Sequence, residues 1–326
     1  TATGVYSPLD KSVLLVAAER GKSSSAHAGA KSSPASAAVD ESLLTHELTH
    51  ALQDQHFDLL KLLTAKPYSF DRAEAAFAVV EGDAVSVQRR AERGAAAWSR
   101  VTPEDAARVE DARFAAYRAE LGALFPPLLT ETFIFRYRDG ARLVETARRR
   151  GGGRAVDDLF ARPPASSEQV LHPEKYFASE APRGIDFDEG SLASAGWNVA
   201  TSTPLGELGA RGLLLKSLSR RDAERAAAGW GGDRAYLFTR GTNDTLFVWK
   251  TAWDSSRDAQ EFFRAYNVLM GARGATGESA SKDGQTNQVK TWRETDATTR
   301  VLLEGDTVLI LRGREADVES ALRAAQ

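Results

Sequence analysis

One stretch decides how this sequence folds and what it can bind, Thr45-His46-Glu47-Leu48-Thr49-His50-Ala51-Leu52-Gln53-Asp54-Gln55-His56-Phe57. Its composition favours a helix, on which positions i and i+4 lie on the same face. His46 and His50 have this spacing, so both imidazoles can bind one metal ion from the same side. Glu47 is then placed to act on a water molecule at that metal. The stretch therefore predicts a metal-binding helix.

The histidines and the apolar residues of this segment are expected on different faces of the helix. The chain has five histidines, and the stretch contains three of them, His46, His50 and His56. The apolar residues form a separate stripe, which we expect to anchor the helix in a core: Leu44, Leu48, Ala51, Leu52 and Leu59.

Length, charge and composition limit the classes of protein to consider. The 326 residues are enough for two domains, each with its own core. A net charge of −3 gives no reason to expect a nucleic-acid or membrane-surface partner. Apolar runs such as Val13–Ala18 are too short to cross a membrane. Cysteine is absent, which leaves histidine and carboxylate side chains as metal ligands.

The first residues of the sequence indicate the cellular compartment that we expect for the protein. The chain opens at Thr1 and enters strand-like sequence at once. This start is typical of a protein from which a targeting or pro-segment has been removed, and it favours a secreted or periplasmic location.

Residues 1–194 predict a mainly helical catalytic domain with a short N-terminal β-hairpin. Two short strands are expected within Gly4–Val16, followed by a loop over Gly21–Ala38 that holds a solvated His27. The basic run Arg148–Arg150 before three glycines predicts a helix end. The patterns favour helices over Asp40–Leu63, over Asp71–Trp98, after Thr102 and over Leu128–Arg150.

Residues 195–326 predict a smaller α+β accessory domain with a mostly antiparallel sheet, so that the chain as a whole is α+β. Gly271–Thr286 is rich in glycine, serine and alanine and predicts a loop. Strands are expected at 235–239, 245–251, 288–292, 299–304 and 307–312, with helices at 258–269 and 315–325.

Two residues compete for the third protein ligand that a catalytic zinc ion requires. His56 follows His50 at the spacing of the metzincin pattern HExxHxxGxxH. That pattern needs glycine where this chain has Gln53, and on a continuing helix His56 is rotated by about 240° from His50. The only methionine, Met270, lies in the other half of the chain, so a Met-turn is missing as well. We therefore prefer Glu81.

Glu81 interrupts an apolar stripe of the next predicted helix, formed by Phe77, Ala78, Ala84 and Val85. A carboxylate buried there is costly unless it is paired or bound to a metal. The adjacent Gly82 weakens a helix by about 1 kcal/mol relative to alanine, which is explained if another backbone approaches closely. The alternative for Glu81 is a buried salt bridge to an arginine such as Arg89.

These motifs carry a family resemblance. His46-Glu47-x-x-His50 followed by Glu81 on a later helix resembles the gluzincins, the thermolysin-like zinc metalloproteases, over about the first 180 residues. Val80-Glu81-Gly82-Asp83-Ala84 is similar to the Asn-Glu-Gly-x-Ala motif of zinc aminopeptidases. The resemblance implies that His46, His50 and Glu81 bind zinc and that Glu47 is the catalytic base.

The chain departs from thermolysin at one position. Thermolysin has an aspartate four residues after the ligand glutamate, whereas this chain has Val85. The hydrogen-bond partner of a ligand histidine must therefore come from elsewhere, and Asp54 and Asp83 are the candidates.

A donor for the oxyanion of the transition state is expected near His172-Pro173. The segment Ser167–Pro173 is similar to the His-Pro element of the gluzincin branch that contains the CAAX prenyl endopeptidases. The arginine that usually follows is absent here, which leaves Tyr176 as a second donor. The alternative is that His172 is a half-buried histidine in a turn.

The sequence thus predicts a zinc-dependent peptidase, expected to be an endopeptidase, with Zn²⁺ as cofactor and a peptide or protein as substrate. Glu47 would be the general base, and His172 or Tyr176 the oxyanion donor. Strand Ser12–Val16 offers an edge to an extended peptide. The alternative is a zinc-stabilised binding module or an inactive protease homologue whose C-terminal domain mediates recognition. The presence of Glu47 favours the enzyme, because a structural zinc site has no need of that carboxylate.

Overall fold

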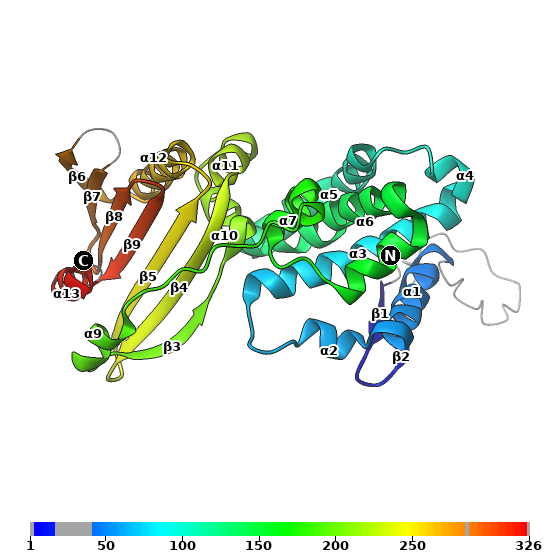
Figure 1. The fold of residues 1–326 in the computed structure, drawn as a ribbon, viewed down its shortest axis with the longest axis horizontal. Coiled ribbons are helices and arrows are strands. Elements are labelled where there is room, and N and C mark those ends of the chain that lie inside the picture. The colour runs from blue at the N-terminus through cyan, green and yellow to red at the C-terminus, as the bar shows by residue number, and fades with distance from the viewer. Residues whose placement is uncertain (1–2, 17–40, 284–286, 325–326) are drawn as a thin grey trace, which may run out of the picture. The chain divides into compact units, whose positions relative to one another are not determined.

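The computed structural model describes residues 3–16, 41–283 and 287–324 (Figure 1). The predicted loop Gly21–Ala38 with His27 lies outside these residues. The described chain combines helices with an N-terminal antiparallel hairpin and a seven-stranded antiparallel sheet, which confirms the predicted α+β class. None of the described helices is both long and apolar enough to cross a membrane.

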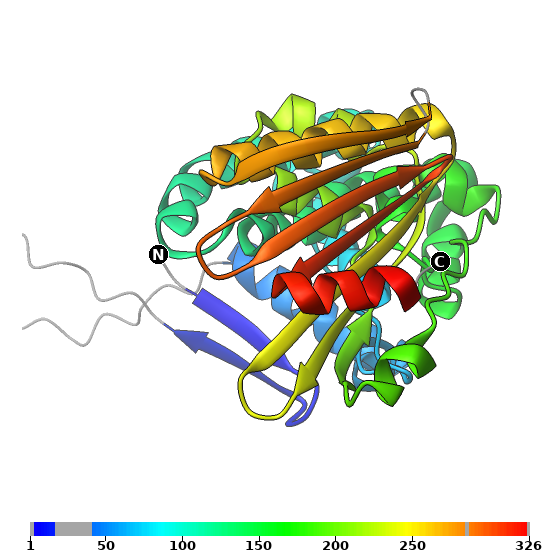
Figure 2. The same ribbon diagram turned by 90° about the vertical axis from the view of Figure 1, so that its left-hand side faces the viewer.

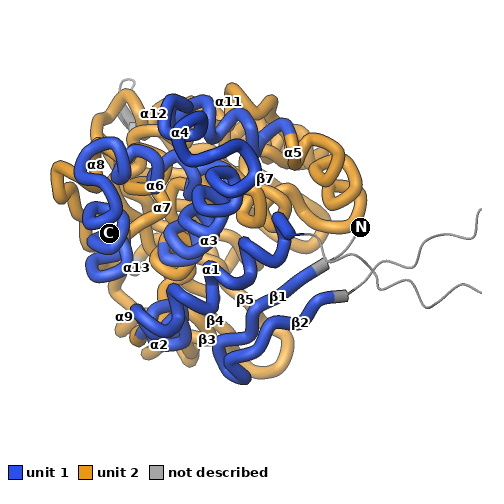
Figure 3. The backbone as a smooth tube through the Cα atoms, turned by 90° about the vertical axis from the view of Figure 1, so that its right-hand side faces the viewer, with its two compact units in different colours: residues 1–65, 76–112, 136–163 blue, residues 66–75, 113–135, 164–326 orange. Residues whose placement is uncertain are grey.

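Contacts within the chain define two units, which are coloured separately in Figure 3. Unit 1 comprises residues 1–65, 76–112 and 136–163, and unit 2 comprises residues 66–75, 113–135 and 164–326. The predicted division into domains 1–194 and 195–326 stays a prediction.

Unit 1 begins with the predicted hairpin, β1 (Thr3–Ser7) and β2 (Ser12–Val16), in which Val5 pairs with Leu14. The Tyr6 hydroxyl donates a hydrogen bond to Asp54 Oδ2 over 2.6 Å, and Lys11 Nζ forms an ion pair with the same oxygen. Asp54 belongs to α1 (Glu41–Phe57), so this carboxylate fastens the hairpin to that helix.

The helix predicted over Asp40–Leu63 is divided into α1 (Glu41–Phe57) and α2 (Leu59–Leu63). Asp58 between them has a left-handed backbone with φ of 52°. Its side chain accepts a hydrogen bond from Lys61 N and thereby caps α2. The prediction of one continuous helix is wrong at this point, because the local cap of Asp58 replaces a helical turn.

The orientation predicted for α1 is also wrong. Leu48 and Leu52, expected in the core, are 48% and 56% exposed. The buried face is polar and contains His46, Glu47, Thr49, His50, Gln53 and Asp54. Helix α1 therefore packs largely through polar side chains, while Phe57 at its end stacks on Phe160.

The remaining helices that contribute to unit 1 are long, except for one of four residues. They are α3 (Phe70–Arg93), α4 (Ala95–Trp98), α5 (Pro103–Leu124) and α6 (Pro127–Ala161), and α3, α5 and α6 each have residues in both units. Gly94 has φ of +82° and divides the helix predicted over Asp71–Trp98. Gly151 and Gly152 leave the helical conformation within α6, so the helical turns stop after Arg150, as predicted, and resume beyond the glycines.

Unit 2 contains the seven-stranded sheet, with strand order β3-β4-β5-β9-β8-β7-β6 (Figure 2). The strands are β3 (Asn198–Thr203), β4 (Trp230–Arg240), β5 (Asp244–Trp253), β6 (Thr276–Asp283), β7 (Asn287–Arg293), β8 (Thr298–Glu304) and β9 (Thr307–Gly313). Strands β4, β5, β7, β8 and β9 match the five predicted strands. The prediction of a loop over Gly271–Thr286 is wrong, because α12 extends into its start and β6, which follows, pairs with β7.

The helices that follow α6 in the chain are α7 (Ser167–Leu171), α8 (Pro173–Phe177), α9 (Glu189–Ser194), α10 (Gly206–Leu214), α11 (Arg220–Ala227), α12 (Ser256–Ala272) and α13 (Glu315–Ala324). Those from α9 onward cover both faces of the sheet. One face, with Trp249 and Trp253, packs against α10, α11 and α12. The other face, with Tyr236 and Phe238, packs against α9 and α13, and Figure 2 shows α13 lying over the strands.

Candidate metal centre

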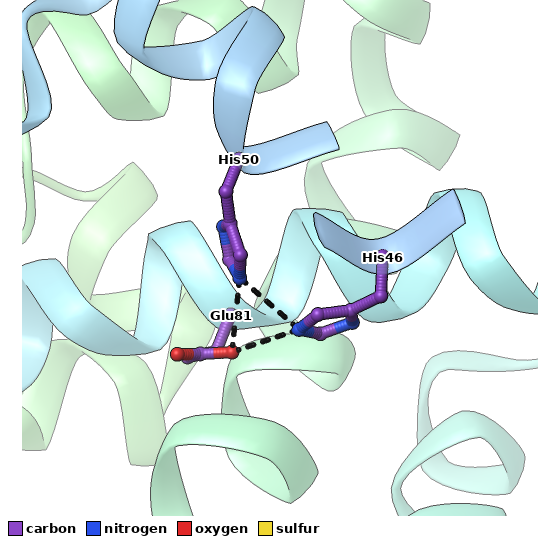
Figure 4. Close-up of side chains that lie close together, drawn as sticks. All are labelled: His46, His50 and Glu81. Carbon is purple, nitrogen blue, oxygen red and sulfur yellow. Dashed lines mark hydrogen bonds and ion pairs between the residues drawn. The ribbon is translucent and has the colours of Figure 1, made fainter. Parts of the chain in front are cut away.

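The structure brings the three predicted ligands together (Figure 4). Helix α1 supplies His46 and His50, and α3 supplies Glu81. Oε2 of Glu81 lies 3.2 Å from His46 Nε2 and 3.5 Å from His50 Nε2, and the two Nε2 atoms are 3.1 Å apart. All three donor atoms point to one place within unit 1.

These distances suit a tetrahedral metal ion. Bonds of 2.0–2.2 Å from zinc to nitrogen and oxygen separate neighbouring ligand atoms by about 3.3 Å. The three observed separations, 3.1, 3.2 and 3.5 Å, bracket this value. Both histidines are 8% exposed, so the protein already excludes most solvent from the ligands. Two imidazoles and one carboxylate are a donor set that zinc accepts in catalytic sites.

The charges around Glu81 favour its ionised form, which is the form that binds metal. Burial alone raises the pKa of the Glu81 carboxyl, but hydrogen bonds from His46 and His50 outweigh burial and hold this pKa well below its usual range. Burial lowers the pKa of His50, whereas Glu81, Gln53 and Glu47 raise it, and the net effect is a pKa above the usual value.

A close crossing of α3 and α6 places Glu81. A Cβ atom added to Gly82 would lie 2.3 Å from the carbonyl carbon of Gly140, and one added to Gly140 would lie 2.1 Å from the oxygen of Ala78. Only glycine fits at either position, because the two backbones are in direct contact. The close backbone approach predicted from Gly82 is thus confirmed.

Arg89, the alternative partner of Glu81, has other partners. Its Nε donates to Glu110 Oε1 over 2.7 Å, and its Nη1 donates to Glu92 Oε2 over 2.7 Å. The two histidines occupy the position next to Glu81 instead. The observed contacts therefore support the ligand interpretation over the salt bridge.

His56, the other candidate for third ligand, is exposed and lies outside the cluster. Helix α1 continues past Gln53 to Phe57, as the argument from the missing glycine required. The ring of His56 lies 6.2 Å from that of Phe57. On the continuous helix α1, His56 is rotated by about 240° from His50 and so lies on another face.

Glu47, the predicted base, is 5% exposed and is not one of the three converging donors. Its charge contributes to the raised pKa of His50, which shows that it lies near the ligands. A Cβ atom added to Gly4 of β1 would approach Glu47 Cγ to 3.0 Å. The hairpin backbone therefore rests on the side chain of Glu47.

Tyr137 is a site residue that the sequence analysis missed. It lies on α6, one turn before Gly140, and its ring stacks on His46 with centroids 6.2 Å apart and planes at 24°. Burial, the charge of Glu81 and a hydrogen bond to Glu81 raise the pKa of the Tyr137 hydroxyl well above its usual value. No local pattern marks this tyrosine, because the crossing of α3 and α6 brings it to the ligands.

The two aspartates proposed as partners of a ligand histidine have different surroundings. Asp54 accepts hydrogen bonds from Tyr6, Lys11 and the amide of Leu59. Its partners therefore lie in the hairpin and at the start of α2, and it is not the partner of His50. Asp83 accepts a hydrogen bond from Gln53 Nε2 over 3.0 Å. Gln53 in turn contacts His50 Nδ1 over 2.9 Å, so it is the direct partner.

His172 and Tyr176 belong to unit 2. His172 Nε2 lies 3.0 Å from Glu207 Oε2, and its side chain is 31% exposed. Tyr176 lies on α8, where its ring packs edge-on against Phe177. Their predicted role as oxyanion donors stays a prediction.

A second group of carboxylates in unit 2, Glu168, Glu180 and Asp254, surrounds an amino group. Lys175 Nζ lies 2.7 Å from an oxygen of each of the three. The lysine ammonium already occupies the place that a metal ion would need, so this cluster is an ion-pair network.

Comparison with known proteins assigns a family to the chain. No curated protein and no solved structure matches it significantly. Residues 159–323, just over half of the chain, match the family model described as a domain of unknown function (DUF8575). This segment includes the whole seven-stranded sheet and begins near the end of α6. The chain belongs to the DUF8575 family.

Proposed function

We propose that this protein is a zinc-dependent peptidase of the endopeptidase type, with His46, His50 and Glu81 as metal ligands. One observation carries the proposal. Three donor atoms from two helices converge at separations that fit zinc, and a buried carboxylate, Glu47, lies beside them without joining them. A purely structural zinc site would not need Glu47.

The residues around the ligands suit peptide hydrolysis. Zinc bound at such a site supplies Lewis acidity, which acidifies water and polarises a carbonyl group. Glu47 accepts the proton of the attacking water and delivers it to the leaving amine. We assign the hydrogen bond to the oxyanion to Tyr137, because its hydroxyl lies beside Glu81 in the same unit as the ligands. Strand Ser12–Val16, the edge expected to bind an extended peptide, pairs with β1, and Gly4 of β1 lies against Glu47.

The wild type and two variants test the proposal in an assay with casein or a peptide library. Wild-type protein should bind one zinc ion per chain and cleave. Glu47→Gln should retain the zinc and lose activity by about 10³-fold or more, because a general base contributes on the order of 10²–10⁴-fold. Glu41→Gln is the matched control, since Glu41 is an exposed glutamate in the first turn of the same helix. Cleavage that survives Glu47→Gln would refute the mechanism.

The ligand set is tested by metal content. Glu81→Ala removes one of the three converging donors and should strip zinc from the protein. His56→Ala should leave one zinc per chain, because His56 is exposed and lies outside the cluster. Loss of zinc from His56→Ala with retention in Glu81→Ala would restore the metzincin arrangement.

One observation favours a second function, that of a zinc-stabilised binding module. The match to the DUF8575 model covers residues 159–323, which exclude all three ligands. A family defined by the sheet could use the sheet for recognition and the metal for stability. One zinc per chain without cleavage by the wild type, in an assay that detects a control protease, would support this alternative.

A further inference from the structure

Gln53 is buried on α1, one turn after His50, with 4% of its surface exposed. Its amide nitrogen Nε2 donates hydrogen bonds to the backbone oxygen of Val80 over 3.1 Å and to Asp83 Oδ2 over 3.0 Å. A backbone carbonyl oxygen can only accept, so the –NH₂ group of Gln53 must face Val80. The orientation of the side-chain amide is therefore determined by its partners.

This orientation directs the amide oxygen of Gln53 to His50. Oε1 lies 2.9 Å from His50 Nδ1. An amide oxygen accepts hydrogen bonds and cannot donate, so the hydrogen must be on Nδ1. With hydrogen held on Nδ1, the nitrogen that can offer a lone pair to a metal ion is Nε2, which is the atom that faces Glu81 and His46.

A further ion pair holds the acceptor of Gln53 in place. Arg148 of α6 lies 3.3 Å from Asp83 Oδ1, while the other oxygen of Asp83 accepts from Gln53. The contacts run from α6 through α3 to α1, all within unit 1.

We propose that Gln53 is a positioning residue that keeps hydrogen on His50 Nδ1 and so leaves Nε2 as the nitrogen that binds the metal. The inference rests on the proposed metal site for its purpose, although the hydrogen on Nδ1 is a property of the metal-free protein. Outer hydrogen-bond partners of this kind change metal affinity by about 10–100-fold.

The decisive variant is Gln53→Met, which keeps the length of the side chain and removes both the acceptor and the donor. Gln55→Met is the matched control, because Gln55 is exposed on the same helix. Asp83→Asn is the conservative variant, since an asparagine oxygen can still accept from Gln53. We expect zinc to bind 10–100-fold more weakly to Gln53→Met and within about threefold of wild type to the other two.

The hydrogen on Nδ1 is measured directly by long-range ¹H–¹⁵N NMR of metal-free protein labelled at its five histidines, with His50 assigned by the signal missing from His50→Gln. The wild type should show hydrogen on Nδ1, and Gln53→Met a population of His50 that lacks it. A wild type without hydrogen on Nδ1, or wild-type zinc affinity in Gln53→Met, would overturn the inference. The wild-type spectrum tests the hydrogen on His50 Nδ1 even if Gln53→Met fails to fold. Absence of peptidase activity would refute the proposed function and leave this result unchanged.

Discussion

The sheet of unit 2 and helix α1 of unit 1 bury side chains of opposite chemistry. In unit 2 the sheet buries apolar and aromatic residues, among them Trp249, Trp253 and Phe262. In unit 1 helix α1 buries histidine, glutamate and glutamine and leaves Leu48 and Leu52 exposed. The sheet is stabilised mainly by apolar burial, whereas the helix that carries the candidate site is held by specific hydrogen bonds. Stability and the candidate function therefore depend on different kinds of contact.

The largest expected effect separates these two kinds of burial. Trp249 is fully buried, and Trp249→Ala should lower the free energy of unfolding by about 3–5 kcal/mol. Leu48→Ala on α1 should change it by less than about 0.5 kcal/mol, because Leu48 is 48% exposed. Urea unfolding measures both values. A cost for Leu48→Ala near that for Trp249→Ala would mean that α1 also depends on apolar packing.

A smaller effect is expected where unit 1 depends on close contact between backbones. Gly82→Ala places a Cβ atom 2.3 Å from Gly140, so the helices must separate, at a cost of about 1–3 kcal/mol. Zinc affinity should fall too, since Glu81 adjoins the contact. Gly122→Ala in α5 is the matched control, because no atom lies within 4 Å of the new Cβ and alanine should stabilise that helix by up to about 1 kcal/mol. Urea unfolding and zinc titration measure both variants. Equal stability and equal zinc affinity of Gly82→Ala and Gly122→Ala would contradict this account.

A last comparison concerns two buried carboxyl groups whose pKa values shift in opposite directions, Glu81 in unit 1 and Asp71 in unit 2. Two histidines lower the pKa of Glu81 in unit 1. In unit 2, burial raises the pKa of Asp71 to about 7, with further contributions from the charges of Asp233 and Glu168. Folded protein then binds this proton more tightly than unfolded protein does, so stability should fall as the pH rises from about 4 to about 7.

Asp71→Asn removes this titration. Its stability should decrease less steeply over the same pH range, by at most about 1.4 kcal/mol per pH unit. Asp233, whose pKa burial raises to about 6, should preserve part of the slope in the variant. The measurement is urea unfolding at several pH values between 4 and 8. A variant with the wild-type slope would show that Asp71 is ionised in the folded protein across this range.

Residue spacing predicted the parts of the site that depend on one helix or on one local departure from a pattern. The i, i+4 histidines, the carboxylate of Glu81 on an apolar stripe and the adjacent Gly82 all stand out within a few residues. Gln53 and Tyr137 did not stand out as site residues, because their roles depend on contacts with α3 that only the folded chain creates. The exposed stripe of α1 was misassigned for the same reason, since burial of polar residues depends on their partners.

The prediction of the fold fails at the same kind of place, where contacts formed on folding decide the structure. Strands with alternating or continuous apolar residues were predicted correctly, whereas β6, with the sequence TGESASKD, was predicted as a loop. Its composition disfavours a strand, and the backbone of β7 supplies the pairing that composition could not indicate. The break at Asp58 likewise follows from a side-chain cap that competes with the helix.

The contacts of Asp54 bear on how the N-terminal region opens. Its carboxylate accepts a hydrogen bond from Tyr6 and forms an ion pair with Lys11, both in the hairpin. It also accepts a hydrogen bond from the amide of Leu59 at the start of α2. Detachment of the hairpin would remove the hydrogen bonds of Tyr6 and Lys11 and leave the Asp54 carboxylate with the amide of Leu59 and solvent as partners. Opening of the hairpin therefore loses contacts with α1, and we expect the amide protons of β1, β2 and the second half of α1 to exchange with solvent as one cooperative group.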